Sequence, residues 1–280
     1  MRILCAMLGG TIASFDAAGT IRLGETSFVH DHLSGKYPQH EFLFPLFMTY
    51  SSENATPEIY RESLRMIVNE AESSGCDGIL ITHGTDTCAF FAQLAARVLR
   101  VLEIPFVITG SMRSPDVDPD EASGNLDHAV ACLEKGLPGV VFRNDAGECQ
   151  LYAAHLIMSP DIRGIYREYE DGVIPSARDC SRFLSSTKLP RILVIPAVPG
   201  AVIPDSGFDR VLICCNHSGT ASSGLEERVR AWTSHGIPCF MAPIPTKGGV
   251  YESRKILREV GAIELPGMPI EGAWAEVMLR

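Results

Sequence analysis

The sequence predicts an α/β protein built on an open, largely parallel sheet. Short unbroken apolar runs alternate along the chain with longer amphipathic stretches. Unbroken apolar runs are typical of parallel strands buried on both faces, and stretches of this length between them are typical of connecting helices with right-handed crossovers. The 280 residues are too many for one average core, so we expect two domains.

The first half of the chain contains the clearest alternation of strands and helices. Thr56 before Pro57 is a favourable helix start, because threonine caps the N-terminus and proline suits the first turn. We expect strands at Ile3–Leu8, Gly78–Thr82, Phe106–Thr109 and Gly139–Phe142, and helices at Pro57–Ser74, Thr87–Leu102 and Asn125–Lys135.

A second, smaller α/β series follows a charged, turn-rich stretch without clear periodicity. We interpret this stretch, residues 164–190, as the connection between a catalytic domain of residues 1–163 and a C-terminal domain of residues 191–280. In the C-terminal domain we expect strands at Arg191–Ile195, Arg210–Cys215 and Cys239–Ile244, and helices at Leu225–His235, Tyr251–Val260 and Pro269–Leu279.

Composition excludes several classes of function. A net charge of −10 argues against binding to nucleic acid or to an anionic membrane, and no apolar stretch is long enough to span a bilayer. The nine cysteines form no CxxC pair and lie mostly in apolar runs, which indicates buried thiols in a reducing compartment, the cytoplasm. His30-Asp31-His32 lacks a third ligand at a metal-binding spacing, so we expect solvated polar residues there rather than a metal site.

Two glycine–threonine segments follow predicted strands directly. Gly9-Gly10-Thr11 follows the first strand, and His83-Gly84-Thr85-Asp86-Thr87 follows Gly78–Thr82. Either segment alone is explained by a tight turn with a capping side chain. Together they place two hydroxyls at the carboxyl ends of strands, where open α/β sheets bind ligands. A hydroxyl nucleophile and backbone N–H groups for an oxyanion are the components that amide hydrolysis needs.

These segments resemble the two signature motifs of the bacterial-type L-asparaginase and glutaminase family. The resemblance rests on GGTIAS at 9–14 and ITHGTDT at 81–87, and extends to Ser52–Pro57, to TGSMRS at 109–114, to Gly124-Asn125-Leu126 and to GAIELPGMPIEGA at 261–273. It therefore covers most of the chain, and HGTDT is its most specific part.

The resemblance implies a role for each matching residue. Thr11 matches the acylated nucleophile, and Thr85 and Asp86 match the second threonine and its aspartate, which also holds the substrate's α-amino group. Ser52, followed by Glu53, matches the segment that binds the substrate's carboxylate, and Ser111 matches the turn near the leaving amide. The implied substrate is a small-molecule amide, and the implied assembly is a homodimer or homotetramer. The resemblance implies no metal and no organic cofactor.

Two positions depart from the family pattern. The family's tyrosine after the first threonine is replaced here, with Ile21 in its place. Counting from Asn144-Asp145 without gaps, the family's lysine position falls on His155. In one interpretation a neutral imidazole activates Thr85, since its reference pKa of ~6.5 suits a base near neutral pH. In the other, His155 is a polar lining residue and that relay is broken.

Three hypotheses of function follow. The first is an amidohydrolase that forms an acyl-enzyme on Thr11 and releases ammonia from asparagine or a related amide. The second is a catalytically impaired relative that binds an amino acid or amide as a sensor. The third is a subunit that supplies ammonia within an amidotransferase. The intact Thr11, Ser52, Thr85 and Asp86 favour the first, and the two departures favour the second.

Overall fold

The computed structural model has the predicted α/β architecture, and it describes residues 1–24, 27–170, 172–174, 180–222 and 224–280. The chain divides into two compact units. The first contains Met1–Glu168 and helix α5 (Ser181–Ser185) up to Leu184, and the second contains Ser185–Arg280 together with a short stretch that starts at Tyr169. The predicted connection 164–190 is thus shared between the two units.

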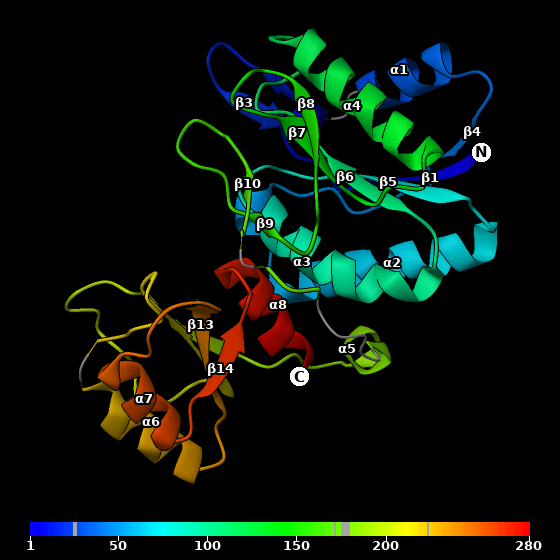
Figure 1. Cartoon of the computed structure of the whole chain (residues 1–280). Coiled ribbons are helices and arrows are strands. Elements are labelled where there is room, and N and C mark those ends of the chain that lie inside the picture. The colour runs from blue at the N-terminus through cyan, green and yellow to red at the C-terminus, as the bar shows by residue number, and fades with distance from the viewer. Residues whose placement is uncertain (25–26, 171, 175–179, 223) are drawn as a thin grey trace. The chain divides into compact units, whose positions relative to one another are not determined.

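The first unit is built on a six-stranded sheet in the order β4-β1-β5-β6-β7-β8 (Figure 1). Its strands are parallel except β8, which runs antiparallel to β7 at one edge. The bounds are β1 (Arg2–Met7), β4 (Glu41–Leu43), β5 (Gly78–Thr82), β6 (Phe106–Thr109), β7 (Gly139–Arg143) and β8 (Cys149–Tyr152).

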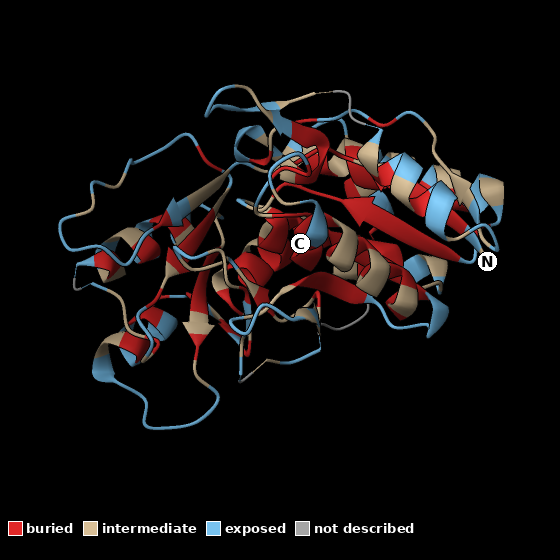
Figure 2. Ribbon diagram, turned by 90° about the horizontal axis from the view of Figure 1, so that it is seen from above, coloured by how far each residue is buried: buried red, intermediate tan, exposed pale blue. Residues whose placement is uncertain are grey.

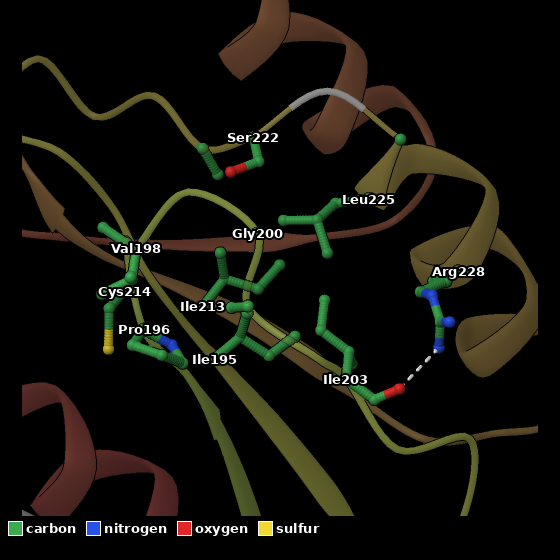
Figure 3. Close-up of a pocket in the computed structure, with 14 residues that line it drawn as sticks. Ile195, Pro196, Val198, Gly200, Ile203, Ile213, Cys214, Ser222, Leu225 and Arg228 are labelled. Atoms are coloured by element: carbon green, nitrogen blue, oxygen red, sulfur yellow. Dashed lines mark hydrogen bonds between the residues drawn. The ribbon is translucent and has the colours of Figure 1, made fainter.

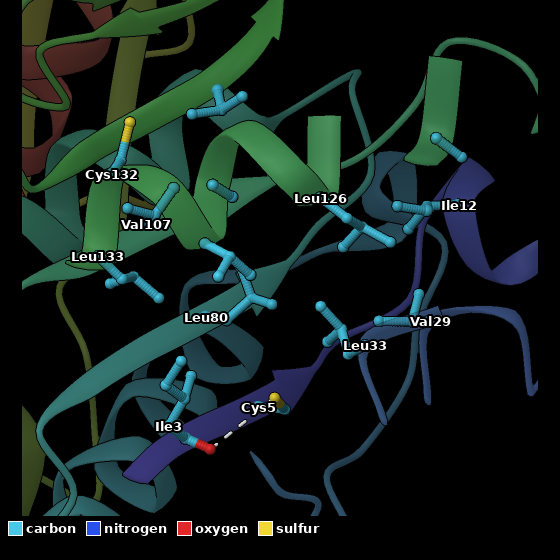
Figure 4. Close-up of a cluster of buried hydrophobic side chains, with 14 residues drawn as sticks. Ile3, Cys5, Ile12, Val29, Leu33, Leu80, Val107, Leu126, Cys132 and Leu133 are labelled. Atoms are coloured by element: carbon cyan, nitrogen blue, oxygen red, sulfur yellow. Dashed lines mark hydrogen bonds between the residues drawn. The ribbon is translucent and has the colours of Figure 1, made fainter. Parts of the chain in front are cut away.

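Two pairs of helices cover the two faces of this sheet, α1 and α4 on one and α2 and α3 on the other (Figure 1). Alternate residues of the strands point to opposite faces. Ile3, Cys5, Leu80 and Val107 therefore pack under α1 and α4 (Figure 4). Val141 belongs to the same cluster. Strands β5 and β6, in the middle of the sheet, are buried along their whole length, and Figure 2 shows the buried interior of the unit in red. The helices are α1 (Phe28–Lys36), α2 (Pro57–Ser74), α3 (Cys88–Val98) and α4 (Pro119–Glu134).

The helix boundaries follow local capping chemistry. Helix α2 has its predicted bounds, and the Thr56 hydroxyl accepts a hydrogen bond from the N–H of Ile59. Helix α4 begins six residues before the predicted start at Asn125, because Asp118 caps it and Pro119 occupies its first turn. The predicted helix Thr87–Leu102 is α-helical only to Val98 and continues as the 3-10 helix η3 (Leu99–Leu102).

One crossover departs from the expectation that all would be right-handed. The chain advances from β5 to β6 and from β6 to β7 in the same direction across the sheet. The first step uses α3 and the second uses α4, and these helices lie on opposite faces (Figure 1). The two crossovers therefore have opposite hands, whereas the hand of a single crossover is nearly always right.

The smaller elements of the first unit lie around this sheet. The antiparallel hairpin β2–β3 follows the 3-10 helix η1, and a second hairpin pairs β9 with β10. None of these strands was predicted, because each has only two or three residues and no detectable alternation. The bounds are η1 (Thr11–Ala13), β2 (Ser14–Asp16), β3 (Ile21–Leu23), η2 (Ser52–Asn54), β9 (Ile157–Met158) and β10 (Arg167–Glu168).

The second unit contains a four-stranded parallel sheet in the order β11-β12-β13-β14. Its strands are β11 (Ile192–Ile195), β12 (Arg210–Cys214), β13 (Cys239–Ile244) and β14 (Ile263–Pro266), and its helices are α6 (Leu225–Ser234), α7 (Glu252–Glu259) and α8 (Ile270–Leu279). All nine cysteines of the chain are free thiols, and seven of them are buried, as their apolar surroundings predicted. No helix among the described residues is long and apolar enough to cross a membrane.

Candidate active site at the carboxyl ends of β1 and β5

The two glycine–threonine segments meet where the strand order reverses. The chain passes from β1 to β4 on one side, and then from β5 to β6 on the other, so the switch point lies between β1 and β5. Thr11 is four residues beyond the end of β1, and Thr85 is three residues beyond the end of β5. Carboxyl strand ends at such a switch point are the usual ligand-binding position of an open α/β sheet.

The contact between the two segments is made by glycine backbone. Gly10 has φ 87° and ψ −178°, a conformation open essentially to glycine alone. A Cβ added to Gly10 would lie 2.5 Å from the backbone nitrogen of Gly84 and 2.7 Å from the carbonyl carbon of His83. The two segments therefore touch at these glycines. Thr11 and Thr85 are the residues that directly follow Gly10 and Gly84 in the sequence.

Ser52 joins the same contact from a third segment. A Cβ added to Gly84 would lie 2.4 Å from the Ser52 hydroxyl oxygen and 3.3 Å from Cα of Gly10. Ser52 is 3% exposed, and its carbonyl accepts a hydrogen bond of 2.8 Å from the Thr87 hydroxyl. Glu53, the next residue of η2, is exposed. The structure thus brings Ser52 to both threonine segments.

Ser111 follows β6, the next strand of the sheet. A Cβ at Gly110 would lie 2.5 Å from the carbonyl oxygen of His83, so this turn also touches the β5 segment. Ser111 is fully buried, and its hydroxyl donates to the carbonyl of Arg113 at 2.5 Å. The carboxylate of Glu121 accepts the N–H groups of Met112 and Arg113, at 2.8 and 3.2 Å. Ser111 therefore lies in a turn held rigidly from helix α4.

The polar groups of the two threonines are unused within the protein. Thr11 and Thr85 are both half-buried, and Asp86 is exposed. Across the described ranges, no hydrogen bond occupies the hydroxyl or the N–H group of Thr11 or Thr85. Half-buried hydroxyl and N–H groups without a partner inside the protein are available to hydrogen-bond a ligand.

A layer of aromatic rings that sequence reasoning missed supports the β5 segment. Nδ1 of His83 lies 2.8 Å from the Gly84 carbonyl, which can only accept, so Nδ1 carries the proton. Nε2 then accepts from the Tyr50 hydroxyl at 3.1 Å. Burial lowers the pKa of His83 to about 4, which keeps the ring neutral. The Tyr60 hydroxyl lies 2.6 Å from the Thr87 hydroxyl, and the Tyr166 hydroxyl donates to the Thr85 carbonyl at 2.8 Å.

Nothing in the sequence pattern pointed to these tyrosines. Tyr60 is in the predicted helix α2, where an aromatic residue is explained by core packing. Tyr166 lies in the stretch interpreted as the connection between domains. Only the folded backbone brings these rings beneath the His83–Thr87 segment.

His155 lies in the turn between β8 and β9, and burial together with the charge of Arg97 lowers its pKa, opposed by Glu168. Among the described residues no hydrogen bond joins His155 to Thr85. Both interpretations of His155 therefore stay predictions.

The other features considered for a ligand lie outside this site. His32 and His30 are occupied by Asp127 and Asp31, and the part of the chain that the structure describes contains no group of three residues able to hold a metal. A cavity of about 260 Å³ in the second unit opens at the ends of β11 and β12 and is lined mostly by aliphatic side chains (Figure 3). It contains none of the residues proposed from the sequence.

This arrangement defines an α/β protein with a hydroxyl-rich site at a topological switch point. Residues 2–155 match the family model described as asparaginase, N-terminal, and the chain belongs to the asparaginase family. The family assignment made from the motifs is thereby confirmed.

Solved structures confirm the fold over the whole chain. The thermostable L-asparaginase from Thermococcus kodakarensis is 23% identical, with a TM-score of 0.73 over 100% of this chain and 92% of that one. The probable cytoplasmic L-asparaginase from Campylobacter jejuni is 20% identical, with a TM-score of 0.72 over 99% and 94%.

The curated relatives are subunits of a larger enzyme. A glutamyl-tRNA(Gln) amidotransferase subunit from Methanobrevibacter smithii is 37% identical over 89 residues, 32% of this chain and 20% of that protein. The corresponding protein of Aeropyrum pernix is 23% identical over 261 residues, 81% of this chain and 61% of that protein. The chain thus spans between a fifth and about three fifths of the length of these relatives.

Proposed function

We propose that this protein is an amidohydrolase that releases ammonia from asparagine or a related small-molecule amide. The contact between Gly10 and Gly84 is the observation that carries the proposal, because each glycine is followed by a threonine whose hydroxyl has no hydrogen-bond partner among the described residues. Membership of the asparaginase family supports the same reaction class.

In the proposed mechanism Thr11 is the nucleophile. Its hydroxyl oxygen attacks the amide carbonyl carbon, and the tetrahedral oxyanion is stabilised by free backbone N–H groups such as that of Thr85. The C–N bond then breaks, and the hydroxyl proton leaves with the nitrogen as ammonia. Water cleaves the resulting ester, which restores Thr11 and releases a carboxylic acid.

Substrate binding is assigned to the surrounding polar groups. The exposed carboxylate of Asp86 is suited to the substrate's ammonium group, and the hydroxyl of Ser52 to its carboxylate. Glu53 and Ser111 complete the proposed binding site, with Ser111 near the leaving amide. Thr85 is the second catalytic hydroxyl. No cofactor takes part in this mechanism.

Ammonia release from asparagine, glutamine and a panel of acylated amides tests the proposal. We expect turnover that is lost in Thr11→Ala and kept in Thr187→Ala, which makes the same chemical change at an exposed position of the second unit. Turnover that survives in Thr11→Ala would remove this residue as nucleophile.

The alternative function is a binding or ammonia-supplying subunit of an amidotransferase. The names of the curated relatives favour it, as does Ile21, which is 51% exposed on β3 in place of the family's tyrosine. Saturable binding of an amide without ammonia release would select this alternative.

We further propose that the protein is cytoplasmic and forms a homodimer or homotetramer. Sedimentation of the purified protein checks the oligomeric state.

A further inference from the structure

Tyr166 lies directly beneath the second threonine of the proposed site. Its hydroxyl donates a hydrogen bond of 2.8 Å to the carbonyl of Thr85, across 81 residues of sequence. The side chain is 1% exposed. The carbonyl of a proposed catalytic residue is thus held by a donor that no motif contains.

The ring of Tyr166 is fixed by its neighbours. It stacks on Phe142 of β7 with centroids 4.6 Å apart and an angle of 29° between the planes. Tyr152 of β8 packs at a tilt against it, with centroids 6.4 Å apart. Because strands β7 and β8 hold both neighbouring rings, the position of the Tyr166 hydroxyl is set by the edge of the central sheet.

The hydroxyl of Tyr166 is a hydrogen-bond donor near neutral pH. Burial raises its pKa well above the ordinary value for tyrosine, and the neighbouring Cys88 thiol and then the negative charge of Asp86 act in the same direction. The phenol therefore cannot serve as a base for Thr11 or Thr85 near neutral pH. Its contribution is geometric.

The bond controls the orientation of the peptide that joins Thr85 to Asp86. The carbonyl of Thr85 and the N–H of Asp86 belong to one rigid plane and point in opposite directions. Fixing the carbonyl toward Tyr166 therefore turns the N–H of Asp86 away from the aromatic layer. It also limits the rotation by which Thr85 and Asp86 could move their side chains.

We propose that Tyr166 is a positioning residue that holds Thr85 and Asp86 in the orientation needed for turnover. Two further rings act on the same segment, since His83 donates to the Gly84 carbonyl and Tyr60 donates to the Thr87 carbonyl at 3.2 Å. Tyr166 differs from both because its bond acts on Thr85 itself. This inference rests on the proposed amidohydrolase function.

Tyr166→Phe tests the inference, because it keeps the ring and its stacking and removes only the hydroxyl. Tyr152→Phe is the matched control. It removes a phenol from the ring that packs against Tyr166, and across the described residues this phenol has no hydrogen-bond partner. For Tyr166→Phe we expect kcat to fall about tenfold, equivalent to about 1.4 kcal/mol of the barrier, with KM little changed. Tyr152→Phe keeps wild-type kcat.

Hydrogen exchange of the amides of residues 84–88 gives a second measurement that does not depend on activity. We expect faster exchange in Tyr166→Phe and wild-type exchange in Tyr152→Phe. Unchanged exchange, or unchanged kcat per folded molecule despite a lower melting temperature, would overturn the inference. An inactive wild-type protein would refute the proposed function instead, and the exchange comparison would still decide whether Tyr166 orders the segment.

Discussion

Substitution of Gly84 by alanine tests the convergence on which the proposed site depends. The new methyl group would lie 2.4 Å from the hydroxyl oxygen and 2.6 Å from Cβ of Ser52, where real Cβ contacts do not occur. Ser52 cannot withdraw easily, because it is buried and its carbonyl is bonded to Thr87. Overpacking of this kind costs about 1–3 kcal/mol.

A loss of about 2 kcal/mol in unfolding free energy should lower the melting temperature of the first unit by about 4–8 °C. Calorimetry on the whole protein measures this change. Gly35→Ala is the control, since a Cβ there would meet no atom within 4 Å. It should be neutral or slightly stabilising, because alanine favours the interior of α1.

Relief by a second substitution makes this experiment specific. Ser52→Gly removes both atoms that the new methyl group would meet, so the double variant Gly84→Ala/Ser52→Gly should recover most of the lost stability. It should remain inactive, because the hydroxyl proposed to bind the substrate is gone. Full stability of Gly84→Ala, or a double variant no more stable than the single one, would refute the contact between these segments.

Three further predictions concern single side chains. The pKa of His83 is about 4 in the folded protein against 6.5 for a free histidine. As the pH falls, the unfolded chain therefore binds a proton at His83 before the folded protein does. The free energy of unfolding should therefore drop by about 3 kcal/mol between pH 6.5 and pH 4, and chemical denaturation of His83→Gln should show a flatter dependence. His155→Ala should retain ammonia release, and its collapse would restore the imidazole to the mechanism. Arg254→Met should lower the unfolding free energy of the second unit by about 3 kcal/mol, because it leaves the largely buried carboxylate of Glu264 without its two hydrogen bonds, of 2.8 and 3.1 Å. Adding Glu264→Leu should restore much of this loss.

The sequence by itself predicted the elements whose signals are local. Helix α2 and strands β5, β6 and β13 have the predicted bounds, because capping residues and apolar runs act within a few residues of the chain. Where a local signal was overlooked, as with Asp118-Pro119 at the start of α4, the boundary was wrong. The family and the fold class also followed from the sequence, since the glycine–threonine motifs are short and specific.

Tertiary structure alone decided how separate segments meet. The approach of Ser52 to Gly84, the opposite hands of the β5–α3–β6 and β6–α4–β7 crossovers, and the hydrogen bond from Tyr166 to Thr85 all depend on residues that are far apart in the chain. No periodicity encodes such contacts, because they arise from the packing of sheet, helices and loops against one another. The same packing surrounds His155 with Arg97 and Glu168, which an ungapped count of residues could not anticipate.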